Sequence, residues 1–325
     1  MNPDQDPSQA HRYIRPKDID NRATFGQRAM WGVENFAWNW LYWKPIRAMS
    51  LEHASRFGAS LLRRIGPLAG GPQRTMTRNL RMAFPDWSEA AIQKTAIGAW
   101  ETLGHIAGEM PHLGQMRPYE SARIEVVGAD KLDAVAASGK PVVFFGGHMA
   151  NWEFLSPTIC LRPLDCLITY RALNNPHIDR CIAQARFDSG IQALAPKGAG
   201  ARDLMRALGR GASVALMNDQ KFNEGIPVPF FGHDAMTAPG PTRLAMRFGV
   251  MLMPMSVLRT GPARYRVTVF DPFLPDNDPD EKAAVYKTVL RINRFVEDRI
   301  REAPDQWFWM HNRWPKEAWI KAGVM

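Results

Sequence analysis

The spacing of apolar positions changes near residue 120, from a helical period to short buried runs. Between residues 26 and 110 apolar side chains recur every three or four positions, as in "IRAMSLEHASRFGASLLRRI", and Ser88 caps a second such segment. From residue 122 apolar runs alternate with amphipathic segments; the runs are "RIEVVG", "KPVVFFGG", "LDCLITYR", "ASVALMND", "VMLMPMSVLR" and "RYRVTVFD". Strands that alternate with helices predict an α/β fold, with a central mixed sheet flanked by helices.

This change of pattern divides the chain into three regions. Residues 1–25 predict a flexible N-terminus, residues 26–110 a helical, membrane-associating region that packs on the core, and residues 111–325 the α/β core. No internal repeat and no low-complexity linker separates these regions. We therefore expect a single integrated α/β domain that carries an N-terminal helical extension.

The segment Ala29 to Ile46, "AMWGVENFAWNWLYWKPI", is the part of the chain closest to a membrane segment. It has four tryptophans, and tryptophan prefers the membrane–water interface. It also contains a glutamate and two asparagines, which are costly inside a bilayer, and no stretch of the chain reaches the roughly 18 apolar residues of a spanning helix. The pattern predicts a helix lying in the interface, with Lys44 and Arg47 near lipid head groups; the alternative is a helix packed on the protein's own core.

Composition and charge limit the classes of protein and partner. Hydrophobic residues at 46% and charged residues at 22% indicate a globular chain. The three cysteines form no CxxC pair, so neither a disulfide framework nor a structural metal site is expected. The polar N-terminus does not resemble a secretory signal. A net charge of +9 favours an anionic partner, although many soluble proteins are equally basic. No nucleic-acid-binding motif accompanies the charge, so we expect no nucleic-acid partner.

Candidate chemistry follows the second apolar run, in "FFGGHMANWEFL". Gly146 and Gly147 end a predicted buried strand, and His148 and Glu153 come directly after it. Ligands of α/β sheets bind beyond the carboxyl ends of the strands. A carboxylate that accepts a hydrogen bond from one imidazole N–H fixes the tautomer and makes the other nitrogen a better base. The pattern therefore predicts a His148–Glu153 pair that removes a proton from a hydroxyl.

Other interpretations of this histidine are open at this point. A single histidine near a strand end is often structural. A zinc site would need a second histidine or cysteine at ligand spacing, and none is present here. The G-x-S-x-G motif of serine hydrolases and the phosphate-binding P-loop are both absent.

Five segments of the chain carry a resemblance to known families. "GGHMANWE" resembles the H-x4-D/E motif of glycerolipid-type acyltransferases, and "TRNLRMAFPDWSEAAIQKTAIGAWETLGHIAGEMPHL" resembles a helical block of the bacterial lipid A biosynthesis (late, lauroyl or myristoyl) acyltransferases. "TYRALNNPHID" and "VALMNDQKFNEGIPVPFFGHDAMTAPGPTRLAMRFG" resemble two further blocks of that family, and "WMHNRWP" resembles its ending. The likeness runs from about residue 45 to about residue 315.

The resemblance implies transfer of an acyl chain from acyl carrier protein to a hydroxyl of a phosphorylated lipid A precursor. His148 would be the general base and Glu153 would orient it. Gly146 and Gly147 are candidates for the oxyanion hole, and no cofactor or metal is implied. The residues implied in substrate binding are Arg171, Asn174, Asn175, Asp219, Gln220 and Gly232. The basic charge would suit the acidic carrier protein, the lipid phosphates and the anionic inner-membrane surface, at its cytoplasmic face.

Several of these residues also have plainer interpretations. Asn174 and Asn175 could cap a helix, Asp219 could cap a turn, and "VPFFG" could be ordinary core rather than the wall of an acyl-chain groove. The family commonly opens with a clearly apolar membrane helix, whereas Glu34 interrupts the equivalent segment here, which favours monotopic or peripheral attachment. Two rival functions are the same chemistry on another glycerolipid or glycolipid acceptor, and a non-catalytic lipid-binding protein of the membrane surface.

Overall fold

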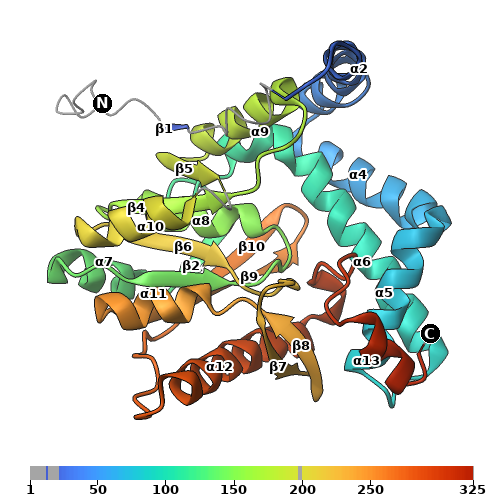
Figure 1. The fold of residues 1–325 in the computed structure, drawn as a ribbon. Coiled ribbons are helices and arrows are strands. Elements are labelled where there is room, and N and C mark those ends of the chain that lie inside the picture. The colour runs from blue at the N-terminus through green and yellow to red at the C-terminus, as the bar shows by residue number, and fades with distance from the viewer. Residues whose placement is uncertain (1–11, 14–21, 197–199, 325) are drawn as a thin grey trace, which may run out of the picture.

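The computed structural model describes residues 12–13, 22–196 and 200–324 (Figure 1). Its centre is an eight-stranded sheet with the strand order β1-β5-β4-β6-β3-β9-β10-β2. The strands are β1 (Arg12–Tyr13), β2 (Ile124–Val127), β3 (Val143–Gly146), β4 (Cys166–Tyr170), β5 (Ala193–Pro196), β6 (Ser213–Met217), β9 (Leu252–Gly261) and β10 (Arg264–Val269). Only β9 and β10 pair antiparallel among neighbours in this sheet, so the predicted mixed sheet is confirmed.

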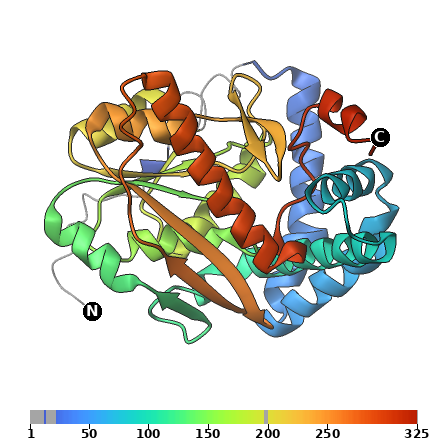
Figure 2. The same cartoon turned by 90° about the horizontal axis from the view of Figure 1, so that it is seen from below.

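Helices cover both faces of the sheet, as predicted. Val143 and Phe145 of β3 pack into a cluster with α10 (Gly200–Gly209), α11 (Gly240–Phe248) and α12 (Glu281–Glu302). Phe144, which points the other way because side chains alternate along a strand, packs into a larger cluster. That cluster includes residues of α7 (Ala129–Ser138), α8 (Leu155–Cys160) and α9 (Pro176–Asp188). Seen from below, α12 lies across the sheet (Figure 2).

The helical block lies between β1 and β2 in the chain and stands beside the sheet in Figure 1. It consists of α2 (Phe25–Ala37), a π-helix (Trp38–Trp43), α3 (Lys44–Ala48), α4 (Leu51–Ile65), α5 (Gly70–Ala83) and α6 (Glu89–Glu109). Helices α4 and α6 approach backbone to backbone at glycines: a Cβ on Gly104 would lie 2.2 Å from the carbonyl oxygen of Gly58. Trp100 of α6 and Met76 of α5 belong to the same buried cluster as the sheet residue Phe144.

The tryptophan-rich segment fits both alternatives in part. Trp43 is buried against the core, whereas Trp40 and its neighbour Leu41 are exposed, with Leu41 at 78%. No helix within the described residues combines the length and the apolar character needed to cross a membrane. The predicted flexible N-terminus lies largely outside the described residues; within it the structure describes β1, which pairs with β5, and a capping box at Thr24 that begins α2.

A hairpin and the C-terminal segment complete the fold. The strands β7 (Ile226–Phe230) and β8 (His233–Thr237) pair only with each other and lie beside α12 (Figure 1). After α12 the chain passes through a short 3-10 helix (Pro304–Gln306) to α13 (Lys316–Lys321). Trp309 and Trp314 of this segment are fully buried, and Trp314 donates to the backbone oxygen of Phe230. The C-terminal segment is thus part of the core.

Candidate active site

The candidate site lies where three neighbouring parallel strands end. Strands β3, β6 and β4 are adjacent in the sheet, and their carboxyl ends lead into the segments that contain His148, Asp219 and Arg171. Residues from distant parts of the sequence therefore meet at one edge of the sheet, where α/β proteins commonly bind ligands.

A histidine–aspartate pair occupies this edge. The Nδ1 atom of His148 lies 2.7 Å from Oδ1 of Asp219. The other carboxylate oxygen, Oδ2, accepts from the backbone N–H of His148 at 2.7 Å and from Nε1 of Trp307 at 2.7 Å. Asp219 is fully buried, whereas the side chain of His148 keeps 18% of its surface exposed. The pair thus has a buried carboxylate and an imidazole that solvent reaches.

Electrostatics favours an ionised Asp219. Burial alone would raise the pKa of this carboxyl group, but the nearby charge of His148 and the hydrogen bonds from His148 and Trp307 outweigh it and lower the pKa to about 2. An ionised Asp219 accepts a hydrogen bond from Nδ1–H, so Nε2 of the neutral imidazole is left as a proton acceptor. The ring also contacts Trp152, with the ring centroids 5.0 Å apart. This geometry suits a general base.

Glu153 is not the partner of His148, contrary to the sequence prediction. Its carboxylate accepts two hydrogen bonds of 2.7 Å from the guanidinium of Arg186 on α9. Ala150, between the two residues, has a left-handed backbone with φ of 43°, and a 3-10 turn begins at Trp152. The chain therefore turns Glu153 away from the strand end and toward α9, and the position expected for its carboxylate is taken by Asp219.

Asn175 serves as a helix cap. Its side-chain oxygen accepts from the backbone N–H of His177 at 3.0 Å, at the start of α9. Its amide donates to the backbone oxygen of Trp31 at 3.0 Å and to the carboxylate of Glu34 at 2.9 Å. The side chain is buried and engaged in these contacts, so Asn175 joins α2 to α9, and its role in substrate binding stays a prediction.

Gly232 lies in the turn of the β7–β8 hairpin. Phe231 and Gly232 both have positive φ, 48° and 76°, between the paired residues Phe230 and His233. Two residues with positive φ are what a type I′ hairpin turn requires. Phe230 is fully buried and packs on Trp314, so the interpretation of "VPFFG" as core holds for it. The structure thus places Gly232 in the hairpin turn, and its role in substrate binding stays a prediction.

The remaining predicted residues stay near the strand ends. Gly146 packs tightly, since a Cβ there would lie 2.9 Å from the backbone oxygen of Met255. Gly147 lies beside Asp219, where a Cβ would approach Oδ2 to 3.4 Å. Arg171 and Asn174 are exposed beyond β4, and Gln220 is half-buried directly after Asp219. This group of predicted residues consists of Gly146, Gly147, Arg171, Asn174 and Gln220. Their roles in oxyanion stabilisation and substrate binding stay predictions.

Sequence reasoning missed two partners in this region. Trp307, which donates to Asp219, lies 88 positions later in the chain. Arg186, the partner of Glu153, looks like any basic residue of an amphipathic helix. The tryptophan-rich ending "DQWFWMHNRWP" was the one available signal, because so many tryptophans in a tail indicate burial against something. Within the described residues, no group of three or more histidine, cysteine, aspartate or glutamate side chains is arranged to hold a metal ion.

Comparisons with known proteins cover most of the chain. The family model of bacterial lipid A biosynthesis acyltransferases matches residues 31–316. The lipid A biosynthesis lauroyltransferase of Escherichia coli (strain K12) is 27% identical over 245 residues, 73% of this chain and 76% of that protein. The palmitoleoyltransferase of lipid A biosynthesis from the same organism is 24% identical over 246 residues, again 73% and 76%. The phosphatidylinositol mannoside acyltransferase of Mycobacterium tuberculosis (strain CDC 1551 / Oshkosh) is 26% identical over 233 residues, 68% and 73%.

Proposed function

Because the chain belongs to the bacterial lipid A biosynthesis acyltransferase family, we propose that it moves a fatty acyl chain from an acyl-carrier-protein thioester to a hydroxyl of a phosphorylated lipid A precursor. The single observation that carries the mechanism is the 2.7 Å contact between His148 and the buried Asp219 at the carboxyl end of β3. A positioned imidazole with one nitrogen held by a carboxylate is suited to remove a proton from an attacking hydroxyl.

The proposed reaction is a direct transfer and needs no covalent enzyme intermediate. Nε2 of His148 takes the proton of the acceptor hydroxyl while the hydroxyl oxygen forms a bond to the thioester carbonyl carbon. The tetrahedral intermediate then expels the thiolate of the carrier, the C–S bond breaks, and the imidazolium returns its proton to sulfur. Asp219 stabilises the imidazolium throughout. Backbone N–H groups near Gly146 and Gly147 are our candidates for stabilising the oxyanion, a contribution of about 3–4 kcal/mol per donor.

We assign anion binding to Arg171 and membrane contact to the helical block. Arg171 is exposed beyond β4, next to the strand that leads to Asp219, and is placed to bind a phosphate of the acceptor or of the carrier. The apolar side chains Val33, Phe36 and Leu41 are exposed on α2 and the π-helix, and Lys44 follows them. Such a surface suits an anionic bilayer, with the site at its cytoplasmic face.

A second acceptor class has one observation in its favour. One similar protein is a phosphatidylinositol mannoside acyltransferase, so the same core also occurs in a protein named for a glycolipid acceptor. Transfer to a glycerolipid or glycolipid hydroxyl would use the same His148–Asp219 pair. A purely lipid-binding role fits less well, because it does not explain why the ionised carboxylate of Asp219 is buried behind the solvent-exposed imidazole of His148.

The test is acyl transfer by purified protein in detergent. The protein receives a panel of acyl-carrier-protein thioesters and a tetra-acylated lipid A precursor, with His148→Ala as the control, and mass spectrometry detects products. We expect one added acyl chain, and its absence with His148→Ala. Transfer only to offered glycerolipids or glycolipids would replace the acceptor assignment. His148→Ala activity within about tenfold of the wild type would overturn the base assignment, since general bases contribute about 10²–10⁴-fold.

A further inference from the structure

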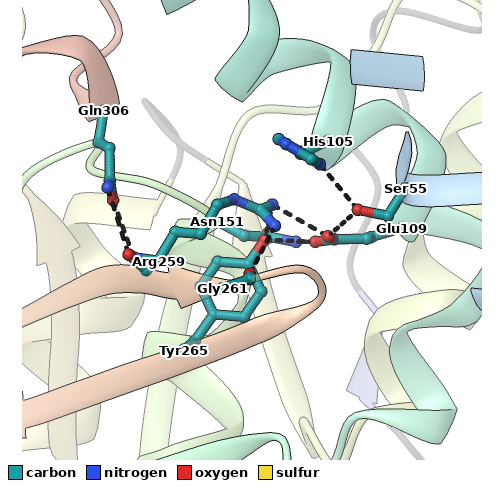
Figure 3. Close-up of polar contacts among 8 residues, drawn as sticks. All are labelled: Ser55, His105, Glu109, Asn151, Arg259, Gly261, Tyr265 and Gln306. Carbon is teal, nitrogen blue, oxygen red and sulfur yellow. Dashed lines mark hydrogen bonds and ion pairs between the residues drawn. The ribbon is translucent and has the colours of Figure 1, made fainter. Parts of the chain in front are cut away.

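A second buried carboxylate lies behind the site, at the end of α6. Glu109 has no exposed surface, and its carboxylate contacts side chains from four different segments (Figure 3). The donors are Ser55 of α4 at 2.7 Å, Asn151 of the His148 loop at 2.9 Å, Arg259 of β9 at 2.9 Å, and Tyr265 of β10. Glu109 therefore joins the helical block, the His148 loop and the central sheet.

Such a group is costly unless it is fully bonded. Burying a carboxylate costs several kcal/mol per ion, and replacing a buried ion pair with apolar side chains is often neutral or stabilising. Here both oxygens of Glu109 are satisfied, one by Ser55 and Arg259 and the other by Asn151 and Tyr265. Burial and the adjacent Glu109 also raise the pKa of Tyr265 well above its ordinary value, so its hydroxyl stays a donor. Stability alone is therefore a weak reason for this arrangement.

Two routes connect Glu109 to the catalytic pair. The first is direct: Asn151 belongs to the loop that begins with His148, and the N–H of the strained Ala150 donates to the backbone oxygen of Gln306 at 2.6 Å. The second passes through Arg259, whose backbone N–H donates to the side chain of Gln306 at 2.8 Å.

Gln306 connects the second route to the carboxylate of the pair. The next residue in the chain, Trp307, donates to Asp219 at 2.7 Å. In the other direction, the backbone N–H of Phe308 donates to the carbonyl oxygen of His148 at 3.1 Å. The segment 306–308 thus lies between Arg259 and both members of the pair, and displacement of Arg259 would move its anchoring points.

We propose that Glu109 is a positioning residue of the acyltransferase site, which holds the His148 loop through Asn151 and the Trp307–Asp219 contact through Arg259. The inference rests on the proposed function for its kinetic consequence. On this proposal the helical block also contributes to catalysis. Because α4 and α6 pack closely through Gly58 and Gly104, Ser55 and Glu109 are held in a fixed position, and the His148 loop packs against them. A misplacement of about 1 Å at such a position costs roughly a hundredfold in rate.

The test is a reciprocal exchange of donor and acceptor. Asn151→Asp places a second carboxylate against Glu109, and we expect kcat to fall roughly a hundredfold while KM changes little. Asn151→Asp combined with Glu109→Gln reverses the hydrogen bond, because the amide now stands at 109, and keeps the total charge of the two positions unchanged. We expect this double variant to recover most of kcat. Asn151→Ala, which removes only the donor, covers the case in which Asn151→Asp does not fold.

Two controls separate positioning from simple stabilisation. Glu101→Gln is the matched substitution on the same helix, since Glu101 pairs with Arg63 at the surface; kcat should stay at the wild-type value. Urea unfolding of every variant tells whether kcat only follows the folded fraction. If the double variant regains stability without regaining kcat, or if all folded variants keep wild-type kcat, the positioning role is wrong.

A measurement that needs no substrate, the rate of chemical modification of His148, separates failure of this inference from failure of the proposed function. Diethyl pyrocarbonate modifies imidazole nitrogens, and mass spectrometry reports its rate at His148. We expect Asn151→Asp to change this rate several-fold and the double variant to restore it. This pattern in a protein that transfers no acyl chain would retain the inference and remove the proposed function. An active wild type without the pattern, in kcat or in modification, would remove the inference alone.

Discussion

At the scale of single residues, the proposed mechanism makes the charge of Asp219 decide which nitrogen of His148 acts as the base. Asp219→Asn keeps the size of the side chain but removes the charge that holds the proton on Nδ1 of His148. An amide donor at this position favours the other tautomer, in which Nε2 carries the proton and is no longer a base. We therefore expect kcat to fall about 10³–10⁴-fold, as in hydrolases whose orienting aspartate is replaced by asparagine. Steady-state acyl transfer measures the effect.

Glu153→Gln is the control for this change. It breaks the ion pair with Arg186 rather than the contact to His148, so the cost falls on stability. Breaking a largely buried pair by removing one partner costs about 3–5 kcal/mol. Folded Glu153→Gln protein should be markedly more active than Asp219→Asn protein. Equal losses in both folded variants would return the orienting role to Glu153.

The same carboxylate predicts a pH dependence of stability. The pKa of Asp219 is lowered from 3.8 to about 2 in the folded protein. A carboxyl group whose folded pKa is depressed stabilises the fold above its unfolded pKa, and this stabilisation is lost as the pH falls toward the folded value; here it amounts to about 2 kcal/mol. The urea midpoint of the wild type should therefore fall between about pH 5, one unit above the unfolded pKa, and about pH 1, one unit below the folded pKa. Asp219→Asn should show a shallower fall over the same interval; an identical one would contradict an ionised, buried Asp219.

The sequence identified His148 as a candidate base but did not identify Asp219 as its partner. His148 follows a strand end directly, so its location could be read from neighbouring residues. Its contact with Asp219 spans 71 positions. The hydrogen bond from Trp307 to Asp219 depends on how the C-terminal segment folds back. The H-x4-E spacing suggested a local pair, yet the left-handed Ala150 and the 3-10 turn direct Glu153 elsewhere. Local spacing does not determine side-chain direction when the backbone leaves regular structure.

At the scale of elements, the contact between α4 and α6 depends on glycine. In Gly104→Ala the new Cβ would lie 2.2 Å from the carbonyl oxygen of Gly58 and 2.6 Å from Cα of Ala59, so the two helices would have to separate. We expect a loss of about 3 kcal/mol of unfolding free energy, at the upper end for overpacked cores. Gly71→Ala in α5 is the control: no heavy atom lies within 4 Å of its Cβ, and stability should be unchanged or slightly higher. Urea unfolding distinguishes them, and an unchanged midpoint for Gly104→Ala would contradict this close packing.

Strands were predictable where β-branched, aromatic and other apolar residues form a run. All four residues of β3 are buried, and the sequence predicted that strand from the apolar run. The hairpin was not predicted as strands, because Pro227 and Pro229 lie in β7 and proline removes a ladder donor. The hairpin tolerates them because β7 pairs on one side only, with β8. The short β5 was also missed, because its residues, "ALAP", include none of the β-branched or aromatic types that favour strands.

At the scale of the whole molecule, the exposed apolar side chains of α2 and the π-helix predict how the protein meets a bilayer. Val33 and Leu41 are exposed to 71% and 78%, and Phe36 lies between them. Each such side chain contributes about 1–2 kcal/mol when it enters the interface, so Phe36→Ser with Leu41→Ser should lower binding to anionic vesicles at least tenfold. Flotation of purified protein with vesicles measures this.

Controls for membrane binding use the chain's other exposed apolar residues. Leu274→Ser changes a side chain that is 62% exposed on the loop after β10, and vesicle binding should stay unchanged. Added salt should weaken binding of the wild type, because the net charge of +9 attracts anionic lipid and salt screens that attraction. Phe57 and Leu61 on α4 are exposed as well. If serine at these two positions abolishes flotation while the α2 variant still floats, the membrane contact belongs to α4. The bilayer would then lie against the helix that carries Ser55, one hydrogen bond from Glu109.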